Sequence, residues 1–356
     1  MVRLLVMSQC NETFDRIAHE LGGFTCRNAP AIVHLRSPLS LTNWTLPVLE
    51  LMMVFGAALA LWWSIRRLRR DTDPSNLALW IASIVYLLAT EIPLYFPDRF
   101  GMQDRIGVVF DHNVFTVQFL YERLPLYIVA LYPAVTTLAF EIVRVLGVFG
   151  RRRGLLLGSV CVGFVHHCFY EVFDQLGPQR RWWQWNADNP INHPMFASVP
   201  MTSMYIFATL GPAVLTFLVM SRPFSRMRLA GRAVAAGLLV PLGLAILSVP
   251  SSLFNGHVHA QAVVFAVEIA VFALIAIPVL VWQRRAQVAS PNAFLRVYGP
   301  IYLGVLAVLW ISAPPSRVPA AGLVYASVCF ALAVVSLVLA RSAAAESPLT
   351  QAEAQV

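Results

Sequence analysis

Nine long apolar runs separated by short polar segments dominate the pattern of the chain. A helix needs about 20 apolar residues to cross a bilayer. The runs cover residues 44–64, 77–96, 126–149, 154–176, 201–220, 232–250, 260–282, 296–313 and 319–340. This pattern predicts an all-α fold, a polytopic integral membrane helix bundle of about nine transmembrane helices.

The same pattern divides the chain into three parts. Residues 44–341 form the expected transmembrane domain. Residues 1–43 precede it as a non-cytoplasmic segment with a possible interfacial helix. Residues 342–356 are small and polar, which predicts a disordered cytoplasmic tail. The first residues carry one Arg and too short an apolar stretch for a signal peptide.

Composition supports a membrane protein. Of the 356 residues 58% are hydrophobic and 12% are charged, whereas soluble domains carry about 25% charged residues. A single soluble core cannot hide this much apolar surface, but a lipid-facing exterior removes that limit.

Arginine supplies all the positive charge, and the net charge is +8. The arginines cluster in alternate loops, at 66–70, 151–153, 222–232, 284–285 and 341. Because short cytoplasmic loops are rich in Lys and Arg, this predicts a multi-pass protein of the cell membrane with its N-terminus outside and its C-terminus in the cytoplasm. The arginines thus mark topology and predict no nucleic-acid partner.

Two further segments and the cysteines invite structural predictions. Residues 30–43 could lie along the membrane interface or re-enter it, and residues 113–125 suggest an interfacial helix. Cys10 and Cys26 could pair if their region faces an oxidising compartment. The other three cysteines fall within apolar runs and are expected to be inert, namely Cys161, Cys168 and Cys329.

Ionisable residues inside the predicted spans point to function, because they are costly in lipid and usually face a protein interior or a watery cavity. They are Glu50, Glu91, Glu141, His166, His167, Glu171, Asp174 and Glu268. The predicted outer loops add Asp111, His112, Glu122, His193, His257 and His259. Most of these groups lie toward the non-cytoplasmic face, although Glu50 and Glu141 are expected to serve helix packing.

The fourth span is the richest in polar groups. His167, Glu171 and Asp174 have the spacing i, i+4, i+7 and are expected on one helix face, with His166 and Tyr170 on the adjacent stripe. A poorly hydrated carboxyl group can act as a general acid, and a histidine at this depth can relay protons or bind a metal. The three groups could instead form a structural network between helices. No metal-ligand spacing or nucleotide-binding motif predicts a cofactor.

The loop after this span is rich in tryptophan. Trp182, Trp183 and Trp185 could form an interfacial aromatic belt. A belt does not explain the polar residues that follow, which include Asn186 and Asp188. We therefore expect this loop to cover the mouth of a cavity beside Glu171 and Asp174.

Residues 126–220 resemble the integral-membrane carotenoid 1,2-hydratases, which add water to an end of an acyclic carotene. The resemblance lies in an acidic helix end, a Trp183-x-Trp185 pair and a Val199-Pro200 step. It implies that Asp174 replaces the second aspartate of the family motif, the first falling near Tyr170 or Glu171. Gln175 follows Asp174 where the family has proline, Ser198 stands where glycine is usual, and the two histidines are not part of the motif. The loop also resembles that of uncharacterised membrane proteins with a WW-x-W sequence.

The sequence therefore predicts an enzyme that acts on a polyisoprenoid, carotenoid-like or other lipid by acid–base chemistry, with membrane lipid as its surroundings. Asp174 or Glu171 is the expected acid, and His167, with His166, the expected proton relay. Substrate contacts are expected from Trp182, Trp183, Trp185, Tyr170, Asn186 and Asp188, and Glu91 and Glu268 are candidates from neighbouring helices. A proton-coupled transporter or flippase and a non-catalytic scaffold remain alternatives.

Overall fold

The computed structural model of the chain describes residues 11–25, 27, 29–221, 228–283 and 292–345. Within these residues nine helices are long and apolar enough to cross a membrane, which confirms the predicted all-α bundle. The expected pairing of Cys10 with Cys26 lies outside the described residues.

Each membrane helix begins and ends within six residues of its predicted bounds. The helices are α2 (Thr45–Arg70), α3 (Ser75–Tyr95), α4 (Leu126–Val145), α5 (Gly154–Asp174), α6 (Met201–Tyr205) with α7 (Gly211–Met220), α8 (Leu229–Leu247), α10 (Val258–Gln283), α11 (Ala293–Ile311) and α12 (Ala320–Ala345). A π-helical turn, Ile206–Leu210, joins α6 to α7, and short α9 (Val249–Ser252) follows α8. The prediction of a disordered tail from residue 342 is wrong in part, because α12 continues to Ala345; residues 346–356 are not described.

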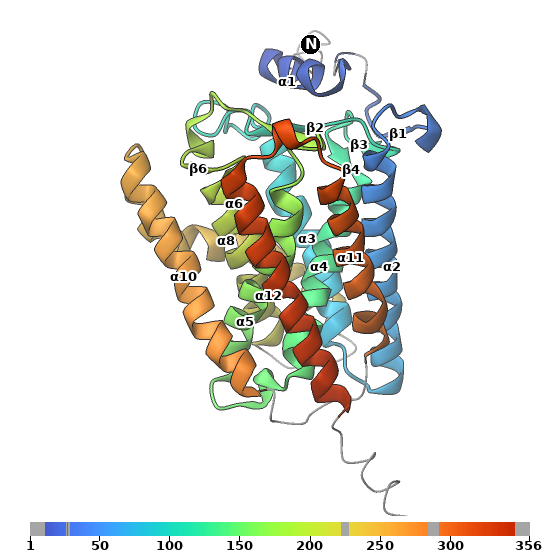
Figure 1. Cartoon of the computed structure of the whole chain (residues 1–356), viewed down its shortest axis with the longest axis vertical. Coiled ribbons are helices and arrows are strands. Elements are labelled where there is room, and N and C mark those ends of the chain that lie inside the picture. The colour runs from blue at the N-terminus through green and yellow to red at the C-terminus, as the bar shows by residue number, and fades with distance from the viewer. Residues whose placement is uncertain (1–10, 26, 28, 222–227, 284–291, 346–356) are drawn as a thin grey trace, which may run out of the picture.

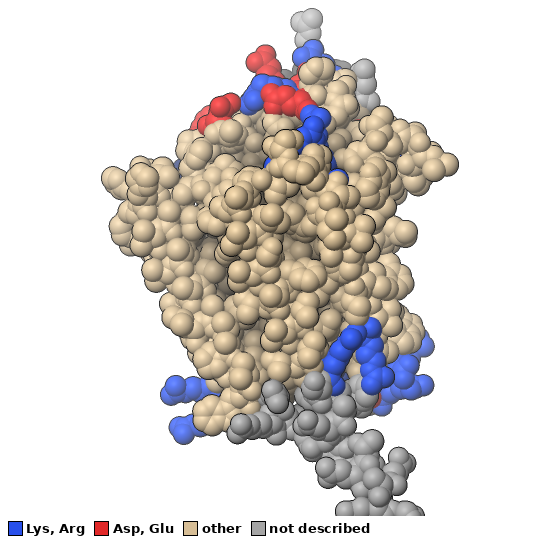
Figure 2. All heavy atoms as spheres, in the orientation of Figure 1, with Lys and Arg blue, Asp and Glu red and all other residues tan. Residues whose placement is uncertain are grey.

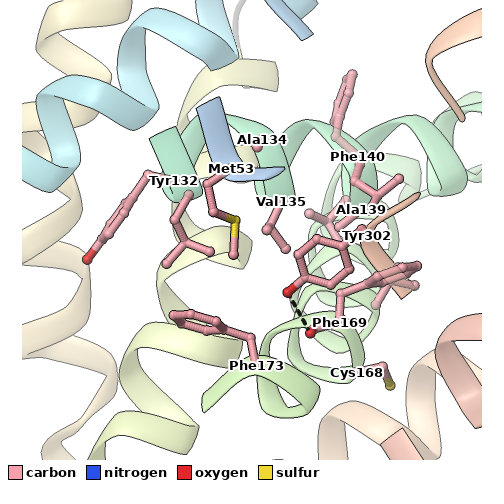
Figure 3. Close-up of a cluster of buried hydrophobic side chains, with 14 of the residues drawn as sticks. Met53, Tyr132, Ala134, Val135, Ala139, Phe140, Cys168, Phe169, Phe173 and Tyr302 are labelled. Carbon is pink, nitrogen blue, oxygen red and sulfur yellow. Dashed lines mark hydrogen bonds between the residues drawn. The ribbon is translucent and has the colours of Figure 1, made fainter. Parts of the chain in front are cut away.

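Helix α4 forms the centre of the bundle (Figure 1). In its most apolar stretch 89% of residues are buried, against 17% for α10, which lies at the outer edge. Figure 3 shows the core between α2, α4, α5 and α11, where the Tyr302 hydroxyl donates to the Phe169 carbonyl at 3.0 Å. The residues of α4 and α5 therefore meet protein rather than lipid on most sides, as a polar site requires.

Charged side chains gather at the two ends of the bundle, with a broad uncharged band between them on the face shown in Figure 2. One end carries the arginines of the last turns of α2 and those that precede α5 and α8. Helix α1 (Glu12–Gly22) lies at the opposite end, which we call the α1 end. The apolar band between the ends matches a bilayer-spanning surface.

A buried carboxylate near the arginine-rich end has a structural role. Both oxygens of Glu141 accept hydrogen bonds, from Trp63 at 3.0 Å, Asn76 at 2.8 Å, Asn292, and Arg144 at 2.6 and 2.7 Å. These partners come from α2, α3, α4 and the start of α11. The expectation that Glu141 serves helix packing is confirmed.

Replacing Glu141 by alanine should lower the free energy of unfolding by about 3–5 kcal/mol, because it leaves the charge of Arg144 uncompensated in a buried network. Unfolding of the purified protein in mixed micelles, titrated with SDS, measures this change. The control is Arg152→Ala, an exposed arginine at the same end, which should unfold as the wild type does. Equal stability of the two variants would contradict the role assigned to Glu141.

Short strands cover the α1 end of the bundle. β1 (Val33–Leu35), β3 (Val117–Phe119) and β4 (Leu124–Pro125) form one sheet, and β2 (Phe110–His112) pairs with β5 (Trp183–Trp185). β6 (Met195–Phe196) and β7 (Val199–Pro200) form a hairpin. We call these strands and their loops the cap. Helix α1 lies on the outer side of the cap and packs against β2 and β5.

The expected interfacial helix at residues 113–125 is wrong. Leu120, Tyr121 and Glu122 all have positive φ, between 53° and 64°, which is incompatible with a right-handed helix. The carboxylate of Glu50, on α2, accepts from the backbone N–H groups of Thr116 at 2.9 Å and Val117 at 3.1 Å. Glu50 thus serves packing, as predicted. Residues 30–43 pair with this segment through β1, with a 3-10 turn at Pro38–Ser40.

Candidate functional site

A small cavity lies beneath the cap at the α1 end of the bundle. Helices α3, α4, α5 and α6 form its walls, and the β2–β5 pair contributes aromatic side chains. Its lining is Glu91, Phe110, His112, Ile128, Tyr170, Phe173, Asp174, Trp183, Trp185, Ser203 and Phe207. The volume is about 30 Å³, room for about two ordered water molecules.

The end of α5 brings an acid and a tryptophan together. Asp174 is the last residue of the helix, and Gly177 and Pro178 follow it. A Cβ atom on Gly177 would lie 1.9 Å from a ring carbon of Trp183, so only glycine lets this indole fold back over the helix end. The chain reversal places Trp183 beside Asp174 in the cavity wall.

Asp174 is 1% exposed, and one of its oxygens accepts a hydrogen bond from the Ser203 hydroxyl at 3.0 Å. Ser203 belongs to α6, the helix that begins directly after the β6–β7 hairpin. The serine therefore fixes the carboxyl group from another wall of the cavity.

Glu91 brings a second carboxyl group to the same cavity. It lies on α3, is 6% exposed, and accepts from the Tyr132 hydroxyl of α4 at 2.7 Å. Its other oxygen has no hydrogen-bond partner within the described part of the chain, and neither do the indole nitrogens of Trp183 and Trp185. Buried polar groups are nearly always hydrogen-bonded, so one acceptor and two donors at this cavity indicate a polar guest such as water or a ligand hydroxyl.

A histidine of the cap lies between two tyrosines. The ring nitrogens of His112 are each 3.0 Å from a hydroxyl, Nε2 from that of Tyr95 and Nδ1 from that of Tyr127. Burial lowers the pKa of His112 to about 3, so the ring is neutral at physiological pH. A neutral imidazole has one donor and one acceptor; one tyrosine therefore donates to the ring and the other accepts from it.

The sequence placed His112 only among polar groups of the outer loops and did not single out Tyr95, Tyr127 or Tyr132. Tyr95 lies four residues after Glu91, on the same helix face. This spacing is the one signal in the sequence that could have joined Tyr95 to the site.

Asp111, beside His112, should make the stability of the protein depend on pH. Burial raises the pKa of Asp111 to about 8, so the folded state keeps a proton that the unfolded state releases near pH 4. Stability is therefore lost as pH rises toward 8, whereas the lowered pKa of His112 opposes this trend only below pH 6.5. From pH 6.5 to 8, at about 1.4 kcal/mol per pH unit, the loss is about 2 kcal/mol.

Thermal unfolding in detergent at pH 6.5 and 8.5 measures this loss. We expect a lower midpoint for the wild type at pH 8.5 and a clearly smaller difference for Asp111→Asn, whose side chain can still accept from the backbone N–H of His112, a bond of 2.8 Å in the wild type. The exposed Asp104→Asn should behave as the wild type does. A pH effect of undiminished size in Asp111→Asn would assign it to other groups.

Two predicted catalytic residues face away from the cavity. The ring of His167 contacts the Thr209 hydroxyl at 2.8 Å and the Tyr325 hydroxyl of α12 at 2.7 Å. Glu171 is 0% exposed and accepts from the Gln175 side chain at 3.1 Å. The three residues expected on one helix face therefore do not share one site. Asp174 lines the cavity, whereas His167 and Glu171 contact other neighbours at other depths of the bundle.

His166 also has a partner in the protein. Its Nδ1 lies 2.8 Å from the Ala208 carbonyl, and its ring stacks on that of Tyr170, which does line the cavity. Among the described residues no group of three or more His, Cys, Asp or Glu side chains is arranged to hold a metal ion.

Four predicted substrate-binding residues are not among those that line the cavity. Trp182 donates to the Thr45 hydroxyl at 2.8 Å, and Asn186 donates to the Val108 carbonyl at 2.9 Å. The others lie elsewhere: Asp188 pairs with Arg16 at 3.0 Å, and Glu268 lies on α10 near Ser251 and Tyr205. The first three hold the cap in place, while Trp183, Trp185 and Tyr170 remain as candidates at the cavity.

Comparison of the chain with protein-family models, with curated proteins and with solved structures finds no match. The resemblance to the carotenoid hydratases therefore depends on the residues quoted above.

Proposed function

We propose that the chain is a membrane enzyme that adds water to an alkene of a polyisoprenoid or similar lipid by acid–base catalysis. One observation carries the proposal: Asp174 and Glu91, two buried carboxyl groups on different helices, line one small cavity with aromatic walls. Paired carboxyl groups on two sides of a reacting centre can act as acid and base.

The proposed reaction begins with proton transfer from the Asp174 carboxyl group to one alkene carbon, which leaves a tertiary carbocation on the other. A water oxygen bonds to the cation and loses a proton to Glu91, giving a tertiary alcohol. Transfer of a proton from Glu91 back to Asp174 restores the site, so alkene and water are the only reactants consumed. The aromatic faces of Phe173, Trp183 and Trp185 favour the cation.

The size of the cavity suits the water more than the lipid. A volume of about 30 Å³ holds about two waters, so the alkene end enters only when lining side chains move. Tyr170, Trp185 and Phe207 are half-buried members of the lining. We assign the entrance to their side of the cavity.

His112 replaces His167 as the proposed relay. The ring nitrogens of His112 contact the hydroxyls of Tyr95 and Tyr127 beneath the cap. Exchange of its proton between the two nitrogens would move a proton between the two hydroxyls and toward the cavity that His112 lines.

The depth of the site supports an enzyme over a transporter. Transporter substrate sites lie near the middle of the bilayer. Here Asp174 is the last residue of α5, and Glu91 lies four residues from the end of α3, about 6 Å along the helix. We also infer from the arginine-rich loops that this site faces the non-cytoplasmic side.

Isotope incorporation tests the proposed reaction. The protein, reconstituted in liposomes that contain an acyclic carotene, is incubated in water enriched in ¹⁸O, and the lipids are analysed by mass spectrometry. We expect a tertiary alcohol that carries one ¹⁸O atom, absent from liposomes with heat-unfolded protein. If neither the carotene nor shorter acyclic isoprenoids gain oxygen, hydration is not the activity.

A further inference from the structure

A polar pocket and an apolar groove follow each other along the bundle. Loops of the cap, α6, the C-terminal end of α8, α9 and α10 line the pocket, and α5, α7, α8 and α10 line the groove. The pocket, of about 650 Å³, lies at the α1 end and is lined by Ser248 and Gln261, among others. The groove, of about 500 Å³, is lined by Leu247 and Phe272, among others. Both volumes fall in the range of ligand sites.

The two spaces are continuous in position along the helices. Leu247 of the groove directly precedes Ser248 of the pocket. On α10, Gln261 and Phe272 are eleven residues apart, about 16 Å along the helix axis. The polar part thus lies at the end of the bundle and the apolar part deeper in the membrane band, the order of head group and chain in a lipid.

Hydroxyl and amide groups supply most of the polar wall of the pocket. They include Asn186, Asn189, Ser248, Ser252, Asn255 and Gln261. Gln261 donates to the Asn255 side-chain oxygen at 2.8 Å, which fixes both amides. Ser248 is 8% exposed, yet its hydroxyl has no partner among the described residues. A buried hydroxyl without a partner indicates a ligand or water that supplies one.

The charges around the pocket do not favour an anion. Asp188 is paired with Arg16 at 3.0 Å. Asp104 and Arg105 are neighbours of opposite sign, and both are exposed. Because no net positive charge faces the pocket, a phosphate would lose its hydration without compensation. The amide and hydroxyl side chains of the pocket can instead donate to and accept from the uncharged hydroxyl groups of a ligand.

The groove is suited to an alkyl chain. Leu239, Leu242 and Ile246 of α8 line it and are 47%, 58% and 61% exposed. Helix α10 lies at the outer edge of the bundle (Figure 1), and its packing is mainly against α5 and α6. The space beside α8 is therefore open to a chain that enters from the bilayer.

We infer that this pocket and groove together bind a membrane lipid whose head group is an uncharged polyol, such as a sugar. The site is separate from the proposed catalytic cavity, and different residues of α6 line the two: Thr202 lines the pocket and Ser203 the cavity. The inference goes beyond the proposed hydration and does not depend on it.

Lipid-dependent thermal stability tests this site. The purified protein is delipidated in detergent and heated with monogalactosyl diacylglycerol, phosphatidylglycerol or diacylglycerol that carry the same acyl chains. We expect the galactolipid to raise the unfolding midpoint by several degrees at saturation, and at concentrations at least ten-fold lower than either other lipid. Equal effects of the three lipids, or a stronger effect of phosphatidylglycerol, would overturn the inference.

Two variants locate the effect. Gln261→Leu removes an amide from the pocket, and Leu242→Trp fills the groove; each should abolish the preference for the galactolipid. Leu274→Trp is the matched control, because Leu274 is 73% exposed and does not line the groove. A preference that persists in both site variants would place the lipid elsewhere. Asp174→Asn should keep the preference, which separates this result from any failure of the hydration proposal.

Discussion

Asp174→Asn should lower the turnover of the proposed hydration by about 10²–10⁴-fold, the usual contribution of a general acid. The asparagine side chain has the same shape as that of aspartate. It can still accept the hydrogen bond that Ser203 donates to Asp174 in the wild type at 3.0 Å. It cannot deliver a proton to the alkene. Turnover in liposomes, with the unfolding midpoint measured in parallel, separates lost chemistry from lost folding.

Glu171→Gln provides a matched control for that substitution. Glu171 is a buried carboxyl group on the same helix, one turn away, and does not line the cavity. The sequence alone left both residues as candidates for the acid, whereas the cavity favours Asp174. We expect turnover near that of the wild type for Glu171→Gln. Loss of turnover in Glu171→Gln but not in Asp174→Asn would reverse the assignment.

The membrane helices could be predicted from the sequence because their signals are local. Bilayer thickness sets the length of each apolar run, and arginines mark alternate loops. The main error at a helix end, in α2, has a simple cause: the helix continues through Arg66 to Arg70, where the residues are no longer apolar. Hydropathy finds where lipid ends, and a helix can extend beyond that point.

The cap could not be predicted in this way, because its pairing joins residues far apart in the chain. Phe110 pairs with Trp185, and Val33 pairs with Phe119. The segment 113–125 reads as apolar because it is covered by protein, with Phe115 0% and Leu124 3% exposed. Hydropathy does not distinguish burial under a cap from contact with a membrane surface.

The candidate site lies between these two cases. Asp174 and Glu91 could be named from the sequence because a carboxyl group in an apolar run is costly wherever it points. Their partners could not, because Ser203 and Tyr132 are ordinary residues that gain a role only through packing. The spacing of His167 and Asp174 predicted that both lie on one helix face at the site, but His167 contacts Tyr325 of α12 instead.

Glu91→Gln should lower ¹⁸O incorporation by about 10²-fold or more while leaving protonation of the alkene intact. The glutamine side chain can still accept from Tyr132, whose bond to Glu91 is 2.7 Å, but it no longer takes a proton from the attacking water. The carbocation then returns its proton to Asp174. In D₂O this reversal replaces hydrogen by deuterium at the alkene without adding oxygen.

The two isotopes together separate the roles of the two carboxyl groups. Glu91→Gln should retain deuterium exchange and lose oxygen incorporation, whereas Asp174→Asn should lose both. Tyr132→Phe removes only the hydrogen bond to Glu91, worth about 1–1.5 kcal/mol, so its hydration rate should fall by about ten-fold with exchange unchanged. If Glu91→Gln loses exchange as completely as oxygen, Glu91 takes part in protonation itself, and the division into acid and base is wrong.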